Sequence, residues 1–183
     1  MLEITIPAIE QWDELKQEFI NTKEQTLRLE HSLVSISKWE SKWHKPFLTK
    51  QPKTDEEVID YIKCMTLTQN VDPAIYNYFY YAKDNIMDDI NRYIEDPMTA
   101  TKFLENGPGK INREKITSEL IYYWMIALNI PLECQKWHLN RLLTLIRVCN
   151  IKSNPPKKMS KRELMSRNAS LNAARRKKLN TKG

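Results

Sequence analysis

Glycine is scarce in this chain, with only three among 183 residues. Glycine-rich loops that cradle phosphates, and the dense tight turns of a β-sandwich, both need more of it. No run approaches the roughly 18 consecutive apolar residues of a membrane-spanning helix, so we expect no membrane segment. Met1 to Pro7 lack the basic-then-apolar order of a signal peptide, which predicts a cytosolic protein.

Cysteine is scarce as well. Cys64, Cys134 and Cys149 are odd in number and far apart, which does not describe a disulfide framework. We expect small buried apolar side chains in a reducing compartment. The sequence also has no P-loop, no dinucleotide-binding fingerprint and no HExxH. We therefore predict that the protein is not an enzyme and holds no cofactor.

One cysteine has a histidine four residues away. Cys134 and His138 would share a face of a continuous helix, at a spacing that can hold a metal. A structural zinc needs two more ligands, and no CxxC pair supplies them. A Cys–His nucleophile also needs a loop and oxyanion donors that a helix lacks. The interpretation we favour is a core cysteine beside a hydrogen-bonded histidine, with neither a metal site nor a catalytic residue.

The net charge of +6 hides an asymmetry along the chain. Residues 152–183 carry eleven Lys and Arg against one acid, Glu163, which amounts to +10. The other 151 residues carry 18 basic and 22 acidic groups, which amounts to −4. A strongly basic tail therefore follows a mildly acidic remainder.

Hydrophobic spacing predicts a mainly α (α+β) fold with a small β element near the N-terminus. Period-two alternation predicts strands at Leu2–Ile6 and at 25–33, and the alternation at 34–37 extends them into a strand pair or a bent strand. Between them, the three- and four-residue apolar spacing from Ala8 to Phe19 predicts a short helix. We divide the chain into an N-terminal α/β segment with a possible β-hairpin (1–53), a helical core (54–151) and the basic tail (152–183).

The helical core begins at a capping box, Thr54 to Glu57, ahead of a helix that reaches Met65. Helices are also expected at 74–80 after Pro73, and at 86–94 with Asp84 as a possible cap. The strongest break follows at 106–109.

Beyond the break, a nearly all-apolar helix at 119–129 and a second from Pro131 to Asn150 are joined by about two residues. A helix that is apolar all round belongs in a core. We therefore expect an antiparallel helix hairpin at the centre of the fold.

The tail follows Asn154-Pro155-Pro156 and opens on a second capping box, Ser160 to Glu163. Its apolar stripe is thin, so the helix is marginal alone and orders when that stripe is covered. Three roles stay open: a solubilising tail, a segment that orders on an acidic protein surface, and nucleic-acid contact. The last is the least favoured, because the tail has no aromatic residues for base stacking and no known nucleic-acid module.

Two tryptophans four residues apart, Trp39 and Trp43, lie among charged residues. They either cover an edge of the core or form a patch that faces a partner. Together with exposed groups of the tail, they make our set of candidate partner-binding residues: Trp39, Trp43, Leu164, Met165, Leu171, Arg162, Arg167, Arg175 and Arg176.

The runs at 37–43, 135–152 and 155–163 resemble those of a set of tailed-bacteriophage proteins, and the similarity is weakest around 70–110. These proteins are in turn similar to tail assembly chaperones encoded near the tape-measure gene. The resemblance implies a helix-rich factor in the host cytoplasm that coats the apolar tape-measure protein, and self-association is compatible with that role. The resemblance does not identify any functional-site residue in this chain. The alternatives are a virion structural protein, such as a capsid, connector or tail component, and a small basic nucleic-acid-binding protein.

Overall fold

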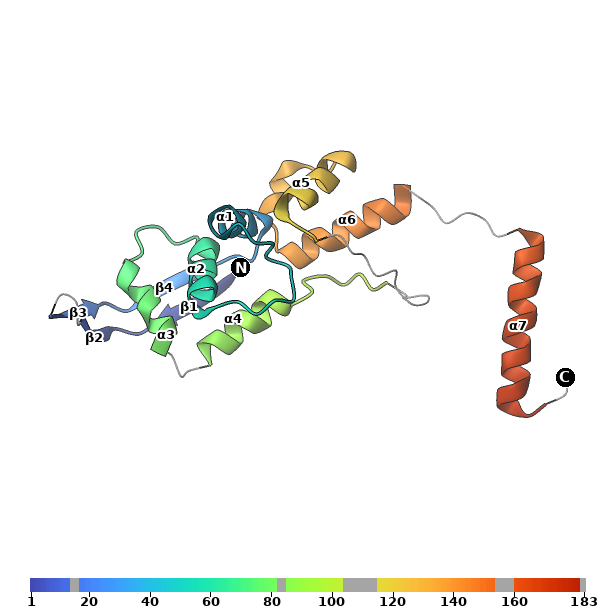
Figure 1. The fold of residues 1–183 in the computed structure, drawn as a ribbon, viewed down its shortest axis with the longest axis horizontal. Coiled ribbons are helices and arrows are strands. Elements are labelled where there is room, and N and C mark those ends of the chain that lie inside the picture. The colour runs from blue at the N-terminus through green and yellow to red at the C-terminus, as the bar shows by residue number, and fades with distance from the viewer. Residues whose placement is uncertain (14–16, 82–84, 104–114, 154–159, 182–183) are drawn as a thin grey trace. The chain divides into compact units, whose positions relative to one another are not determined.

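The computed structural model describes residues 1–13, 17–81, 85–103, 115–153 and 160–181. The chain divides into two compact units, Met1–Cys149 and Asn150–Gly183, which we call the body and the tail unit. Within these described ranges, helices predominate and the strands all lie in the first 29 residues (Figure 1). The predicted mainly α (α+β) class is confirmed. No helix in these ranges is both long enough and apolar enough to cross a bilayer.

The strands form two antiparallel pairs, one nested inside the other along the chain. β1 (Leu2–Ile6) pairs with β4 (Gln25–Leu29), and Leu2 lies opposite Leu29. β2 (Ile9–Asp13) pairs with β3 (Glu18–Thr22). Alternate side chains of β1 and β4 are buried, which is the period-two pattern that the sequence shows.

The short helix expected from Ala8 to Phe19 is wrong, because β2 and the first two residues of β3 lie in that range. Trp12 and Phe19 lie directly opposite each other across the two strands, with ring centroids 4.9 Å apart. Cross-strand pairing of this kind stabilises a hairpin. The seven-residue separation of this pair also fits one face of a helix, so apolar spacing alone does not distinguish the two structures.

Helix α1 (Leu33–Trp43) replaces the expected second strand at 34–37. Ser32 caps it, and the Ser32 hydroxyl accepts a hydrogen bond from the Ser35 amide at 3.3 Å. Such a cap contributes roughly 1 kcal/mol. The helix ends at His44, which has a φ of 52°. The cap and the burial of one helical side outweigh the short polar–apolar alternation.

Helix α2 (Asp55–Met65) begins where the sequence predicts it. The Thr54 hydroxyl accepts from the Glu57 amide at 3.3 Å, and the Thr54 amide donates to the Glu57 carboxylate at 3.0 Å. The predicted capping box is therefore confirmed. Its signal is local, because all of its partners lie within one turn.

Shorter elements lead from α2 to the next long helix. The 3₁₀ helix η1 (Pro73–Asn77) runs into α3 (Tyr78–Tyr81), so the predicted helix after Pro73 is confirmed as two short pieces. Helix α4 (Ile86–Glu95) ends before Asp96, as expected. Asp84 lies outside the described residues.

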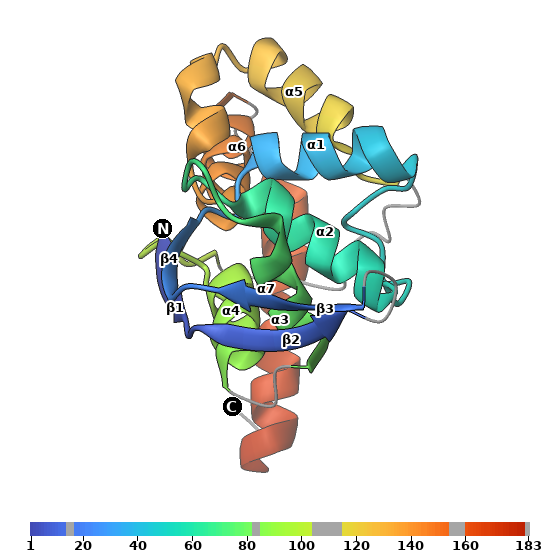
Figure 2. The ribbon, with the colours of Figure 1, turned by 90° about the vertical axis from the view of Figure 1, so that its left-hand side faces the viewer.

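Helix α5 (Ser118–Ala127) is capped by Thr117, whose hydroxyl accepts a hydrogen bond from the Leu120 amide at 3.4 Å. The second helix of the expected hairpin is divided into the 3₁₀ helix η2 (Leu132–Lys136) and α6 (Leu139–Ser153). The expected two-residue connection is therefore wrong. It is α1 that packs against α2, α5 and η2, and it lies between α5 and α2 in both ribbon views (Figure 2).

The burial of α5 is one-sided. Ile121 and Met125 are fully buried, but Tyr123 is 64% exposed and Ile126 is 68% exposed. The expectation that this helix is buried all round is wrong, because α5 lies at the margin of the core and meets it with one side only.

The tail unit holds α7 (Lys161–Leu179), the long helix expected there. Its first turn includes a bond from the Leu164 amide to the Ser160 carbonyl at 2.9 Å. The Pro-Pro segment, the break at 106–109 and the side chain of Glu163, on which the second capping box depends, lie outside the described part of the chain.

Candidate interaction surfaces

The buried carboxylate of Glu40 ties three parts of the body together. Its Oε1 accepts from the Phe47 amide, and its Oε2 accepts from the Ser118 amide, both at 2.7 Å. Ser118 is the first residue of α5, so the carboxylate also meets the positive end of that helix. Both carboxylate oxygens of Glu40 are therefore engaged in holding the fold.

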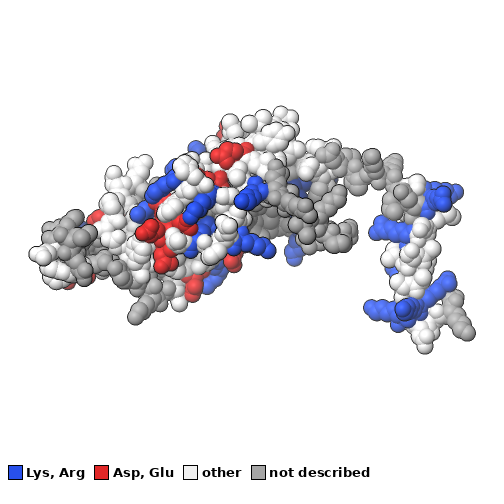
Figure 3. All heavy atoms as spheres, viewed as in Figure 1, with Lys and Arg blue, Asp and Glu red and all other residues white. Residues whose placement is uncertain are grey.

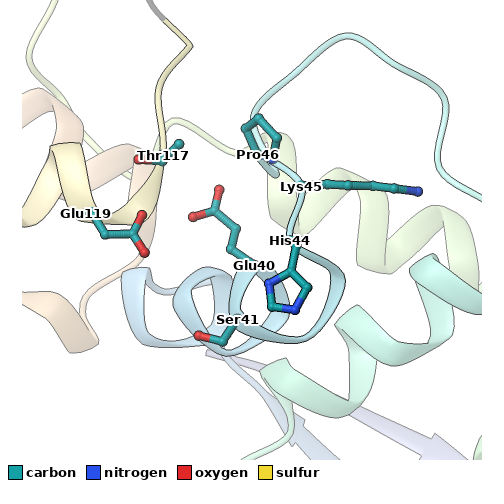
Figure 4. Close-up of a pocket in the computed structure, with 7 residues that line it drawn as sticks. All are labelled: Glu40, Ser41, His44, Lys45, Pro46, Thr117 and Glu119. Carbon is teal, nitrogen blue, oxygen red and sulfur yellow. The ribbon is translucent and has the colours of Figure 1, made fainter.

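A hollow of about 490 Å³ opens beside this carboxylate, between the end of α1 and the start of α5 (Figure 4). The lining residues are Glu40, Ser41, His44, Lys45, Pro46, Thr117 and Glu119.

Several polar groups of this hollow already have partners. The Ser41 hydroxyl donates to the Ser37 carbonyl at 2.8 Å, and Lys45 Nζ lies 2.5 Å from Glu57 Oε1. The Lys45 side chain points away from Glu119 in the close-up. The hydrogen bonds from Lys45 and from the Thr54 amide lower the pKa of Glu57. The seven lining residues thus present no nucleophile held by a base, and the hollow gives no argument for catalysis.

Trp39 belongs to the core. It is 1% exposed, and its Nε1 donates to the Glu57 carbonyl at 2.8 Å. Trp43 is partly buried, stacks on Trp39 with centroids 6.2 Å apart, and donates to Asp60 at 2.9 Å. The interpretation that this pair covers the core is the correct one, and Trp39 offers no surface to a partner.

Cys134 and His138 do not share a continuous helix, because Cys134 lies in η2 and His138 lies beyond its end. Cys134 is buried, and His138 Nε2 donates to the Tyr93 carbonyl at 2.9 Å. This is the core cysteine and hydrogen-bonded histidine of the interpretation favoured from sequence. Over the described ranges, no group of three or more His, Cys, Asp or Glu side chains is placed to hold a metal ion.

His138 pairs with a second buried histidine, His31, with ring centroids 5.1 Å apart. The His31 Nδ1 lies 2.5 Å from the Tyr61 hydroxyl. Burial, and then the neighbouring His138, lower the pKa of His31 to about 3. The Leu139 amide donates to the His31 carbonyl at 2.7 Å. The two rings therefore lie where the start of α6 contacts the connection between β4 and α1.

Exposed apolar side chains gather on the outer side of α5. Tyr123 and Ile126 are three residues apart, so they share one helical face. Leu132, at the start of η2, is 55% exposed, and a 2.9 Å hydrogen bond from the Tyr122 hydroxyl to Gln135 holds η2 beside α5. We call Tyr123, Ile126 and Leu132 the α5 surface. The sequence does not reveal this surface, because an all-apolar helix carries no sign of which side is left open.

A second exposed pair is Trp12 with Phe19 on the β2–β3 hairpin, where the side chains are 48% and 59% exposed. The sequence analysis missed this pair too, since it placed both residues on a helix. A period-two interpretation of the same segment would have set them on neighbouring strands.

The tail residues of the candidate set are exposed on α7. Leu164, Met165 and Leu171 are 48%, 65% and 47% exposed, and Arg162, Arg167, Arg175 and Arg176 are exposed as well. The structure thus separates the candidate set into a tryptophan pair that packs on the core and a group on the surface of α7. No protein-family model, curated protein or solved structure matches the chain.

Proposed function

We propose that the protein acts through protein contacts, as a non-enzymatic morphogenesis factor of a tailed bacteriophage, and that it is a tail assembly chaperone for the tape-measure protein in the host cytoplasm. The observation that carries the protein-contact role is the α5 surface. The phage and chaperone parts rest on the resemblance of the runs at 37–43, 135–152 and 155–163.

The α5 surface suits a protein that holds an apolar partner. Complete burial of an isoleucine-sized side chain contributes about 1.5–3 kcal/mol. Tyr123 and Ile126 are each about two-thirds exposed, so most of that gain is still open to a partner. Grouped exposed apolar side chains mark interaction sites, whereas scattered ones are ordinary.

The resembling runs lie mostly in parts of the fold that build the body. The run at 37–43 is the second half of α1, and the run at 135–152 covers the end of η2 and nearly all of α6. They therefore support a shared architecture more than a shared contact surface. The contact surface has to be tested separately.

The binding test is co-expression with the tape-measure protein encoded nearby, followed by pull-down. We expect Tyr123→Gln with Ile126→Gln to weaken capture tenfold or more, since each 1.4 kcal/mol of lost apolar contact is a factor of about ten. Glutamine keeps the helix propensity high, so the change acts on the surface.

The matched control is Leu67→Gln, which removes an exposed apolar side chain elsewhere on the body. Its capture should equal that of the unmodified protein. Equal capture by the α5 double variant, with an unchanged melting temperature, would rule out the α5 surface as the contact.

A virion structural protein is the rival proposal. Mass spectrometry of purified particles distinguishes it, because a chaperone leaves the assembly and a structural component stays. Detection at the copy number of a tail or capsid protein would contradict the chaperone role and leave the protein-contact role standing.

A further inference from the structure

Helix α7 is exposed over its whole described length and strongly basic. Its cationic side chains are Lys161, Arg162, Arg167, Arg175, Arg176, Lys177 and Lys178. Figure 3 shows basic side chains on both sides of the helix. In the described part of the chain, the four consecutive cations Arg175 to Lys178 form no salt bridge.

The helix lacks a continuous apolar side. A helix that docks in an apolar protein groove presents anchors at about three- and four-residue intervals. On α7, Leu164 and Leu171 are seven apart, but the positions that would extend their row are Asn168 and Arg175. The thin stripe expected from sequence is therefore interrupted by polar groups, which argues against an apolar groove as the binding site for this helix.

The positive charge surrounds the end of the helix. Residues Arg175 to Lys178 are consecutive, and each is rotated about 100° from the one before, so together they face all sides of the last turn. An acidic protein surface meets a helix from one side only. The phosphates of a duplex line both sides of a groove, which matches cations on all sides of a helix.

One side of α7 carries two amide side chains of a kind that can contact base edges. Asn168 and Asn172 stand at i and i+4, so they share a face. Asn pairs with adenine in the major groove, which is wide enough to admit an α-helix.

From this arrangement we propose that α7 is a nucleic-acid-binding helix that takes duplex DNA in the major groove. Its 19 residues span about 28 Å at about 1.5 Å per residue. That length follows roughly eight base pairs. The activity goes beyond the proposed chaperone role and makes no use of the α5 surface, so either stands without the other.

The experiment measures fluorescence anisotropy of a labelled duplex of about 30 base pairs with the full-length protein, at about 50 to 300 mM salt. Each phosphate contact contributes about −0.9 to the slope of log affinity against log salt. Replacing Arg175, Arg176, Lys177 and Lys178 by alanine should make the slope shallower by about 3 to 4.

The matched control removes four exposed body lysines with the same change in net charge: Lys23→Ala, Lys50→Ala, Lys102→Ala and Lys115→Ala. Its salt slope should equal that of the unmodified protein. Single-stranded DNA of the same length should bind several-fold more weakly, because it offers no groove.

Three results would overturn the proposal. They are no binding of the duplex at about 50 mM salt, an equal loss of slope in the control, and displacement of DNA by polyglutamate at equal charge concentration. The last would instead assign α7 to acidic proteins.

Discussion

Lowering the pH from about 8 to about 5 is expected to reduce the free energy of unfolding by roughly 2 kcal/mol through His31 alone. The pKa of His31 is about 3 in the folded chain, and its ordinary value is 6.5. Between those values the unfolded chain binds a proton that the folded chain does not. Stability is therefore complete above pH 6.5 and falls as the pH drops toward 3.

The surroundings of His31 explain the direction. The ring is 2% exposed, and the groups around it are the Tyr61 hydroxyl, the Phe47 ring and His138. His138 donates from Nε2 to the Tyr93 carbonyl and accepts at Nδ1 from the Asn140 amide at 3.3 Å. No carboxylate is bonded to either ring in the described structure, so a proton on His31 would be a poorly compensated buried charge.

Urea denaturation followed by circular dichroism at several pH values between 5 and 8 measures the effect. His31→Gln should flatten the curve over this range, whatever its stability at pH 8. An equal pH dependence in the His31 variant and the unmodified protein would contradict the assignment of this loss of stability to His31.

Glu40→Ala is expected to lower the free energy of unfolding by about 3 kcal/mol or more. The substitution leaves the Phe47 and Ser118 amides without their acceptors, and each unsatisfied buried donor costs about 1–3 kcal/mol. It also removes a negative charge from the start of α5. Denaturation in urea at pH 7.5 gives the difference directly.

Two further variants test whether the loss of stability in Glu40→Ala comes from its two hydrogen bonds. Glu40→Gln keeps one acceptor oxygen and turns an NH₂ group toward the other amide, so we expect an intermediate loss. Glu119→Ala removes an exposed carboxylate that lines the same hollow and should cost less than about 1 kcal/mol. If Glu40→Ala changes stability by no more than Glu119→Ala, the carboxylate does not tie α5 to α1 as described.

The Glu40 tie also bears on the proposed function. It positions the first residue of α5, and the α5 surface begins only five residues later, at Tyr123. A variant that folds but loses this tie should therefore also lose part of its capture by the partner. Measuring both the free energy of unfolding and the capture by the partner distinguishes a residue that contacts the partner from a residue that holds the contact surface in place.

Several elements of the fold could be predicted because their signals are local. The capping box at Thr54 and Glu57 satisfies its partners within one turn, and it is present as predicted. The alternation in Leu2–Ile6 and Gln25–Leu29 reports one buried side of a strand. The end of α4 before Asp96-Pro97 also follows from the residues at that position.

The two errors in the type of element arise at residues 8–19 and 34–37. Ile9, Trp12 and Phe19 have helical spacing, but pairing of β2 with β3 places Trp12 opposite Phe19. The segment at 34–37 alternates like a strand, yet Ser32 caps it as a helix whose buried side faces the core. In both places, tertiary pairing or packing outweighs a short local pattern.

The candidate surfaces show the same division. Trp39 and Trp43 were recognisable as an aromatic pair, but only the position of α2 shows that Trp39 donates to a buried carbonyl and is closed to partners. The apolar character of α5 was equally plain. Its exposure depends on how far the core extends across α5, and a side chain on an all-apolar helix carries no mark of that boundary.

By itself, the sequence determined the mainly α (α+β) class, the local starts and ends of helices and the basic helical tail, because these follow from capping, proline and charge along short stretches of chain. Only the tertiary structure decided which side of α5 stays exposed, where Glu40 and His31 are buried, and that Ile9–Asp13 pairs with Glu18–Thr22. The exposure of α5 and the burial of Glu40 and His31 depend on contacts between residues far apart in the chain, and those contacts set both stability and the surface left for partners.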